Sequence, residues 1–154
     1  MKNLYNASKV ILVFSAFTFI GMAHSELPKV IYGNDDRYEV EEYHDRLYRE
    51  YAKSVAGKVA KFKLRTDPSD ESSYTFSKRK LGVRNNLCLG VRYREQNTLP
   101  TCSGFLIAPN LIATAGHCVR TKFDCKNSYW VFDYVESTKS IPKKNVFNCK
   151  KIVR

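Results

Sequence analysis

Apolar residues follow three patterns along this chain, and each pattern predicts a different kind of segment. Residues 10–23 form a mostly apolar run, whereas residues 42–53 place tyrosines and a leucine at helical spacing among charged residues. That spacing predicts a short amphipathic helix. After residue 54 the pattern is typical of β-strands, with short apolar runs bounded by polar and turn residues. We expect strands at 54–64, 87–93, 103–108, 111–114, 129–135 and 145–153.

The segments between the expected strands carry turn residues. Residues 66–73 form a polar loop that contains a proline, and Pro109-Asn110 is a turn signal that joins two strands into a hairpin. Many short strands separated by turns predict an all-β sandwich or barrel. No internal repeat or low-complexity tract interrupts the pattern.

The apolar run near the start is typical of a secretory signal peptide. Lys2 and Lys9 precede it, and Ala23-His24-Ser25 places small residues at the two positions that a signal peptidase reads. The run has 14 residues, whereas a bilayer span needs about 20. We predict cleavage after Ser25, with Ala23 as the alternative site. An N-terminal membrane anchor is the alternative role for this segment; after cleavage no membrane span remains.

The charge of the chain favours acidic partners without identifying one. Lys and Arg number 26 against 15 Asp and Glu, a net charge of +11, and signal cleavage would remove two lysines and lower it to +9. Such a charge attracts acidic surfaces. The basic residues are scattered, and they do not alternate with aromatic residues as in single-strand nucleic-acid binding. We therefore expect a basic surface that attracts acidic partners, and no specific nucleic acid.

The stretch "CSGFLIAPNLIATAGHC", from Cys102 to Cys118, carries the candidate chemistry. Two apolar strands flank a turn and lead through three small residues to His117, and small residues let another backbone or a substrate come close. A bridge from Cys102 to Cys118 would close a loop of about 15 residues and contribute about 3 kcal/mol. It would also fix the position of the residue beside His117. A general base must be held in a precise position, so such a bridge favours that role.

A metal site is the alternative interpretation of the same stretch, with His117, Cys118, Cys125 and Cys102 as ligands. Adjacent His and Cys side chains do not easily point at one ion, and the paired C-x-x-C spacing is absent. We therefore expect neither a metal nor a cofactor.

The histidine stretch resembles the histidine motif of trypsin-like (chymotrypsin-fold) serine peptidases. That motif has a cysteine, a small pair, a strand, a turn, a second strand and then Thr-Ala-(Ala/Gly)-His-Cys. The resemblance implies that His117 is the general base and that Cys102 and Cys118 are bridged. It also implies an antiparallel β-barrel, the first of the two barrels of that fold, with a short N-terminal helix preceding it here.

The chain has five cysteines, an odd number. Cys125 and Cys149 are a candidate second pair, which leaves Cys88 for the other half of the fold.

The two other members of a Ser-His-Asp triad are not found in this sequence. In the family template the aspartate follows the histidine by about 45 residues, which corresponds to a position beyond Arg154. Asp124 and Asp133 are the aspartates after His117, and Asp133 lies too early, in an expected strand that runs away from the motif. No Gly-Asp-Ser-Gly-Gly stretch supplies a nucleophile. The resemblance therefore covers the first half of the family fold.

A second, weaker resemblance lies upstream, in "KVIYGNDDRYEV". It is similar to the mature N-terminus of bacterial glutamyl-endopeptidase-like members, which implies cleavage after Lys29 and a new amino terminus at Val30. The alternative is that residues 26–41 are an N-terminal arm.

These observations lead to one functional hypothesis and one alternative. We expect a signal peptide at 1–25, an arm or pro-segment at 26–53, and a first trypsin-like barrel at 54–154, truncated at its C-terminal side. The resemblance implies an exported (periplasmic or extracellular) serine endopeptidase with polypeptide substrates, present here as the half that carries His117 and therefore inactive alone. The alternative is a non-catalytic protease homologue that binds a protein partner or an acidic surface. An unrelated disulfide-stapled binding module is the third hypothesis.

Overall fold

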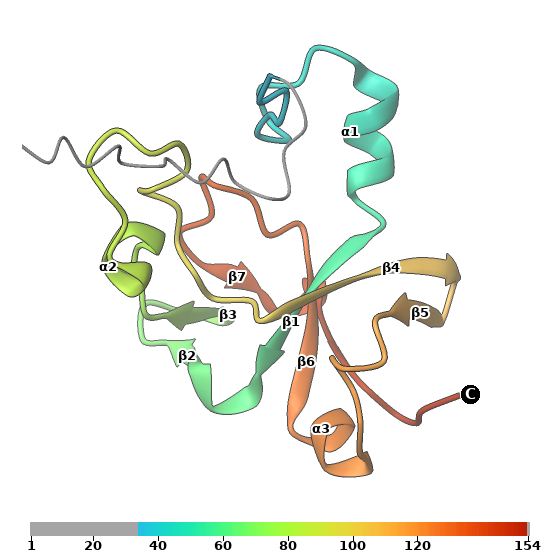
Figure 1. The fold of residues 1–154 in the computed structure, drawn as a ribbon. Coiled ribbons are helices and arrows are strands. Elements are labelled where there is room, and N and C mark those ends of the chain that lie inside the picture. Colours follow the sequence, from blue (N-terminus) through green and yellow to red (C-terminus); the bar gives the residue numbers. More distant parts are fainter. Residues whose placement is uncertain (1–33, 154) are drawn as a thin grey trace, which may run out of the picture. The chain divides into compact units, whose positions relative to one another are not determined.

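Antiparallel sheets dominate the part of the chain that the structure describes, residues 34–153 of a computed structural model (Figure 1). The chain divides into two units, Met1–Asp36 and Arg37–Arg154. The signal peptide 1–25, its Ala23 and Ser25 cleavage sites and the candidate terminus at Val30 lie outside the described residues. Of the first unit only residues 34–36 are described, so the fold below is that of the second unit.

The second unit contains short strands with short helices between some of them. The helical elements are α1 (Arg46–Ala52), η1 (Lys61–Lys63), α2 (Leu81–Asn85), α3 (Lys122–Lys126) and η2 (Lys143–Asn145). The strands are β1 (Val55–Ala60), β2 (Leu64–Asp67), β3 (Asp70–Phe76), β4 (Cys102–Ala108), β5 (Leu111–Thr114), β6 (Ser128–Phe132), β7 (Ile141–Pro142) and β8 (Val146–Asn148). None of the helices within 34–153 has the length and apolar character that a membrane span requires.

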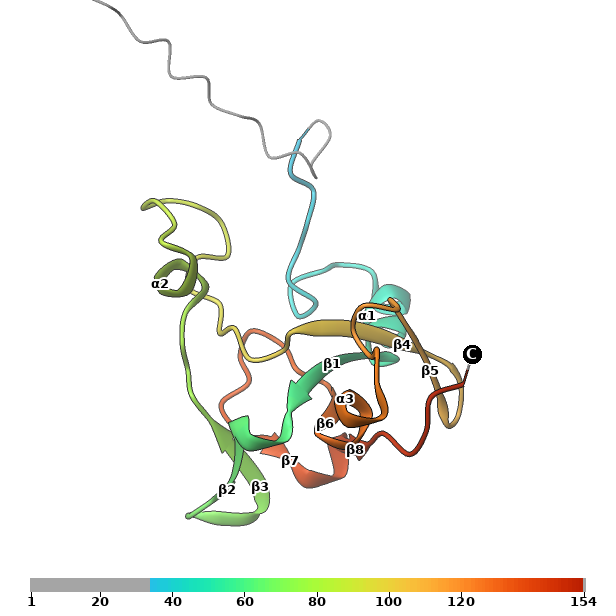
Figure 2. The ribbon, with the colours of Figure 1, turned by 60° about the horizontal axis from the view of Figure 1, so that its bottom comes forward.

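The strands form two sheets. The larger has the order β5-β4-β1-β6-β8 and the smaller the order β2-β3-β7, and all the pairings are antiparallel. Strand β1 lies at the centre of the larger sheet, where Gly57 is opposite Ser103 of β4 on one side and Val131 of β6 on the other. Figure 2 shows β4 running alongside β1. The predicted all-β architecture is therefore confirmed.

The hydrophobic core joins the two sheets. Val59 of β1 and Val131 of β6 are fully buried, and Ile141 of β7 packs in the same cluster. Leu64, Phe76 and Leu99 complete the buried set. Because strand side chains alternate between faces, Val59 and Val131 direct one face of the larger sheet at this core.

The helix and the histidine hairpin that the sequence predicts are both present. The helix expected at 42–53 is α1, which begins after Asp45, whose carboxylate accepts a hydrogen bond from the backbone N–H of Leu47 at 2.8 Å. The strands expected at 103–108 and 111–114 are β4 and β5, joined by the predicted turn. Strand β6 confirms most of the segment expected at 129–135, and β8 a shorter part of 145–153.

Two of the expected elements are wrong. Residues 66–73, predicted as a loop, contain the end of β2 and the start of β3, because Asp67 and Asp70 accept hydrogen bonds from Ser69 and Ser72 and so close a tight hairpin turn. Residues 87–93, predicted as a strand, form turns. Positive φ angles at two positions within this segment prevent an extended chain there, namely Gly90 at 83° and Tyr93 at 61°.

Candidate active site around His117

His117 follows directly from the β4–β5 hairpin. Strand β5 ends at Thr114, and the chain then turns, with the N–H of Cys118 donating to the carbonyl of Ala115 at 2.9 Å. The side chain of His117 lies in this turn and is exposed. An exposed imidazole at the end of a hairpin can be reached by a group that approaches from solvent.

A disulfide between Cys102 and Cys118 holds this turn to the start of β4. The two Cα atoms are 6.0 Å apart, and Cys118 is buried. Thr114 adds a second tie across the same hairpin, because its hydroxyl donates to the carbonyl of Ser103 at 2.7 Å. His117 therefore lies between a strand end and a cross-link, both of which restrict its backbone.

Two small residues, Ser103 and Gly104, follow Cys102, and packing requires the second of them to be glycine. A Cβ atom at Gly104 would lie 2.7 Å from Cγ2 of Ile112 and 2.9 Å from a ring carbon of Trp130. The hairpin can therefore pack against Trp130 of β6 only if this position has no side chain. Gly116, beside His117, has no atom within 4 Å of such a Cβ, so open space lies next to the residue that precedes the histidine.

The cysteines near His117 do not offer thiolates to a metal. The sulfur atoms of Cys102 and Cys118 and a ring nitrogen of His117 lie within 4.8 Å of one another, the one such cluster among the described residues. Both sulfurs are bonded to each other, whereas a protein metal site uses the deprotonated thiol. Cys125, the fourth ligand of that alternative, is bonded to Cys149. The residues present do not fit a metal.

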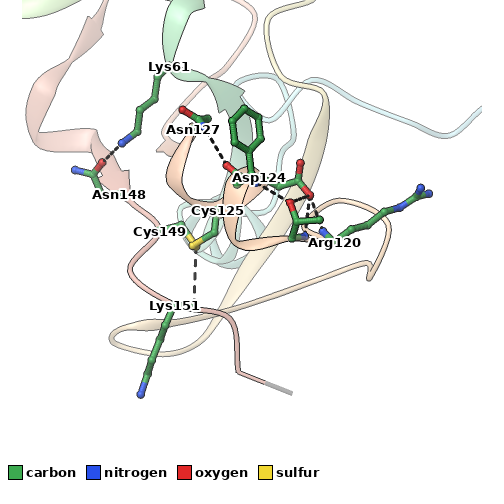
Figure 3. The surroundings of a disulfide bond; sticks show 10 residues. Lys61, Arg120, Asp124, Cys125, Asn127, Asn148, Cys149 and Lys151 are labelled. Carbon is green, nitrogen blue, oxygen red and sulfur yellow. Dashed lines mark hydrogen bonds between the residues drawn. A yellow bond between two sulfur atoms is a disulfide. The ribbon is translucent and has the colours of Figure 1, made fainter.

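Asp124 has a local structural role at the start of α3 (Figure 3). Its carboxylate accepts hydrogen bonds from the backbone N–H groups of Arg120 at 3.0 Å and Thr121 at 2.9 Å, while the Thr121 hydroxyl accepts from the N–H of Asp124. This is a reciprocal capping box. The hydrogen bonds from Thr121 lower the pKa of Asp124, so the carboxylate is charged at neutral pH. No hydrogen bond within residues 34–153 joins it to His117.

Asp133 also has a role away from His117. It lies directly after β6, not within it as the sequence predicts, with φ at 53°. Its carboxylate accepts a hydrogen bond from the side-chain amide of Asn145 at 3.1 Å. Both aspartates downstream of His117 are thus engaged locally, and neither orients the imidazole in the part of the chain that the structure describes.

A second disulfide joins α3 to the residue after β8. Cys125 and Cys149 have Cα atoms 5.1 Å apart, and Cys88 is free and exposed. Both disulfides join cysteines that were paired from the sequence, whereas α3 was not predicted. The Thr-x-x-Asp spacing at Thr121 and Asp124 is the signal that would have found it, since it is typical of a helix start.

Comparison with known protein families matches the C-terminal part of the chain. Residues 84–154 match the family model described as Trypsin. No curated protein matches the chain, and no solved structure matches it. The matched segment contains the β4–β5 hairpin, both disulfides and His117.

Proposed function

Because the chain is trypsin-like over residues 84–154, we propose that it contributes the general base of an exported serine endopeptidase. His117 is that base, and the substrate is a polypeptide. The observation that carries the proposal is the position of His117, exposed in the turn that follows a matched hairpin and cross-linked through its neighbour Cys118.

In this mechanism His117 accepts the proton of the attacking serine hydroxyl and then donates it to the leaving amine of the substrate. A carboxylate that accepts from Nδ1–H would hold the ring in the required tautomer. Since Asp124 caps α3 and Asp133 binds Asn145, we propose that both the carboxylate and the nucleophile belong to a segment outside residues 34–153. The 154-residue chain is then inactive alone.

The genomic sequence beyond the codon of Arg154, read in all frames, tests this proposal. We expect it to encode an aspartate segment and a Gly-Asp-Ser-Gly-Gly-like segment. The joined product should hydrolyse a peptide substrate, and His117→Ala should lower kcat by about 10⁴ or more. The matched control is His44→Ala, because His44 lies before α1 and packs against the ring of Tyr43 at 4.8 Å between centroids. Equal losses in the two variants would contradict a role for His117 in the chemistry.

The 154-residue chain itself provides a second readout. A fluorophosphonate reagent labels an activated serine, and we expect no labelling of this chain because no Gly-Asp-Ser-Gly-Gly stretch supplies a nucleophile. Labelling that disappears in His117→Ala would overturn the proposal that the nucleophile lies elsewhere.

A non-catalytic binding module is the second candidate. The observation in its favour is that both downstream aspartates serve the local fold, as expected for a chain that needs no triad. Absence of both segments from the downstream DNA would favour this candidate.

Export and N-terminal processing belong to the same proposal. Two disulfides fit an oxidising compartment such as the periplasm or the extracellular space. Mass spectrometry of the secreted product would give its amino terminus, for which we propose Glu26 after signal cleavage and Val30 after a second cleavage. An active product that keeps Glu26 would contradict the second cleavage.

A further inference from the structure

A basic cavity of about 650 Å³ lies away from the histidine hairpin, beside the β2–β3 hairpin. Its size falls in the range of small-molecule sites, about 300–1,000 Å³. Its walls come from η1, β2, β3, the residues that follow β3, α2 and the segment before β4. The lining residues are Phe62, Lys63, Arg65, Thr75, Phe76, Ser77, Arg79, Arg84, Thr98 and Leu99.

Four cationic side chains line this cavity and no acidic one does. Lys63 donates to the carbonyl of Leu99 at 3.5 Å, and Arg84 donates to the carbonyl of Thr98 at 3.2 Å. These contacts hold two cations at the cavity wall while leaving other N–H donors of each unused, since an ammonium has three and a guanidinium five. Within residues 34–153 no ion pair neutralises Lys63, Arg65, Arg79 or Arg84.

The cavity wall is held together by backbone pairing. Both the N–H and the hydroxyl of Thr98 donate to the carbonyl of Arg79 at 2.9 Å, and Lys80 forms a β-bridge with Asn97. Arg65 lies directly opposite Thr75 in the β2–β3 hairpin. The cationic groups and the neighbouring hydroxyls therefore come from several segments that hydrogen bonds tie together, and not from one loop.

Apolar side chains form the rest of the lining. Phe76 and Leu99 are buried members of the core, whereas Phe62 on η1 is 81% exposed. A phenylalanine this exposed at the rim of a cationic cavity offers a face on which a flat ring can stack. Hydroxyls of Thr75 and Ser77 add neutral donors among the cations.

We propose that this cavity binds the phosphate or sulfate ester of an aromatic alcohol. The cations and hydroxyls hold the oxyanion through charge-assisted hydrogen bonds, and Phe62 stacks on the ring. The ester comes either from a free small molecule or from a modified tyrosine in a polypeptide. The site shares no residue with the histidine hairpin, so it does not depend on the proposed protease activity.

A second basic cavity, of about 830 Å³ beside the Cys125–Cys149 bridge, provides the contrast. Lysines predominate in its lining, which includes Lys122 and Lys126, and no aromatic side chain is present there. It offers positive charge without a surface for a ring. A ligand that needs both features therefore distinguishes the two cavities.

Calorimetric titration of the full 154-residue chain, with both disulfides formed, tests the proposal. The ligands are phenyl phosphate, phenyl sulfate, inorganic phosphate and a short peptide that contains phosphotyrosine. We expect phenyl phosphate to bind about tenfold more tightly than inorganic phosphate because its ring is buried. Arg84→Gln should weaken both about tenfold by removing a charged donor, whereas Phe62→Ala should weaken only phenyl phosphate.

Lys126→Gln is the matched control, since it removes one charge from the other cavity; we expect less than about a twofold effect from distant screened charge. Arg65→Gln, on β2, repeats the test if Arg84→Gln proves less stable.

Tighter binding of the peptide than of phenyl phosphate supports a polypeptide source, and equal or weaker binding supports a free ligand. Absence of saturable phenyl phosphate or phenyl sulfate binding, or equal losses in Lys126→Gln and Arg84→Gln, would overturn the proposal.

Discussion

At the scale of single residues, the two glycines of the histidine hairpin have opposite surroundings. Gly104 is enclosed by Ile112, Trp130 and the carbonyl of Ala113, each of which would lie within 2.9 Å of a Cβ atom added at this position, whereas Gly116 faces open space. The sequence alone presents both simply as small residues near His117. Only the pairing of β4 with β5 and the packing of Trp130 reveal that one is required by the fold.

We expect Gly104→Ala to destabilise the chain by about 1–3 kcal/mol, because the added methyl overpacks the hairpin against Trp130. Gly116→Ala should change the free energy of unfolding by less than about 0.5 kcal/mol, as for surface substitutions. Urea unfolding followed by Trp130 fluorescence measures both. Equal effects of the two substitutions would contradict the packing described for the hairpin.

At the scale of elements, segments with a clear periodic pattern of apolar residues were predicted correctly. Segments in which turns interrupt that pattern, or in which it is too short, were not. The hairpin formed by β4 and β5 and the helix α1 follow from periodicity and turn residues. The predicted strand at 87–93 failed because its apolar residues are separated by left-handed backbone positions, which a pattern of side chains does not reveal. Helix α3 is only five residues long, too short for a period of 3.6 to be recognised.

The capping box of α3 makes stability depend on pH. Hydrogen bonds from Thr121 lower the pKa of Asp124 below its usual 3.8. A carboxyl group with a lowered pKa contributes stability above its unfolded value, and this contribution is lost as the pH falls through the folded value. We expect Asp124→Asn to lower the unfolding midpoint in urea at about pH 6, and this loss to shrink as the pH falls through the lowered pKa of Asp124.

Thr121→Ala serves as the companion variant, because it removes one partner of the carboxylate and leaves the backbone donors. Its stability should fall less steeply with acid than that of the original chain. An Asp124→Asn effect that does not change with pH would indicate that the carboxylate charge has no part in capping α3.

At the scale of the whole second unit, stability depends on a core shared by two sheets. Val59 and Val131 come from the larger sheet and Ile141 from the smaller one, yet all three are fully buried in one cluster. The sequence indicated the strands of the larger sheet but not β7, a strand of two residues. Strand β7 stabilises the unit because Ile141 packs against residues distant in the sequence. A local pattern of apolar residues does not reveal such contacts.

We expect Ile141→Ala to destabilise the unit by about 2–5 kcal/mol, because it leaves a cavity between the sheets. Ile107→Ala is the matched control: Ile107 is 58% exposed, so its truncation should cost less than about 0.5 kcal/mol. Both values come from urea unfolding of the oxidised chain. Similar costs for the two would show that Ile141 does not join the sheets.

The order β5-β4-β1-β6-β8 leaves an open edge at each end of the larger sheet among the described residues. Its outer strands, Leu111–Thr114 and Val146–Asn148, have no further strand beside them among the described residues. Backbone donors and acceptors along such edges are templates for another strand. A strand that added beside β5 would lie close to His117, which follows the end of β5 in the chain. Self-association through that edge would therefore crowd the histidine, so the chemistry of the imidazole is best studied in dilute protein.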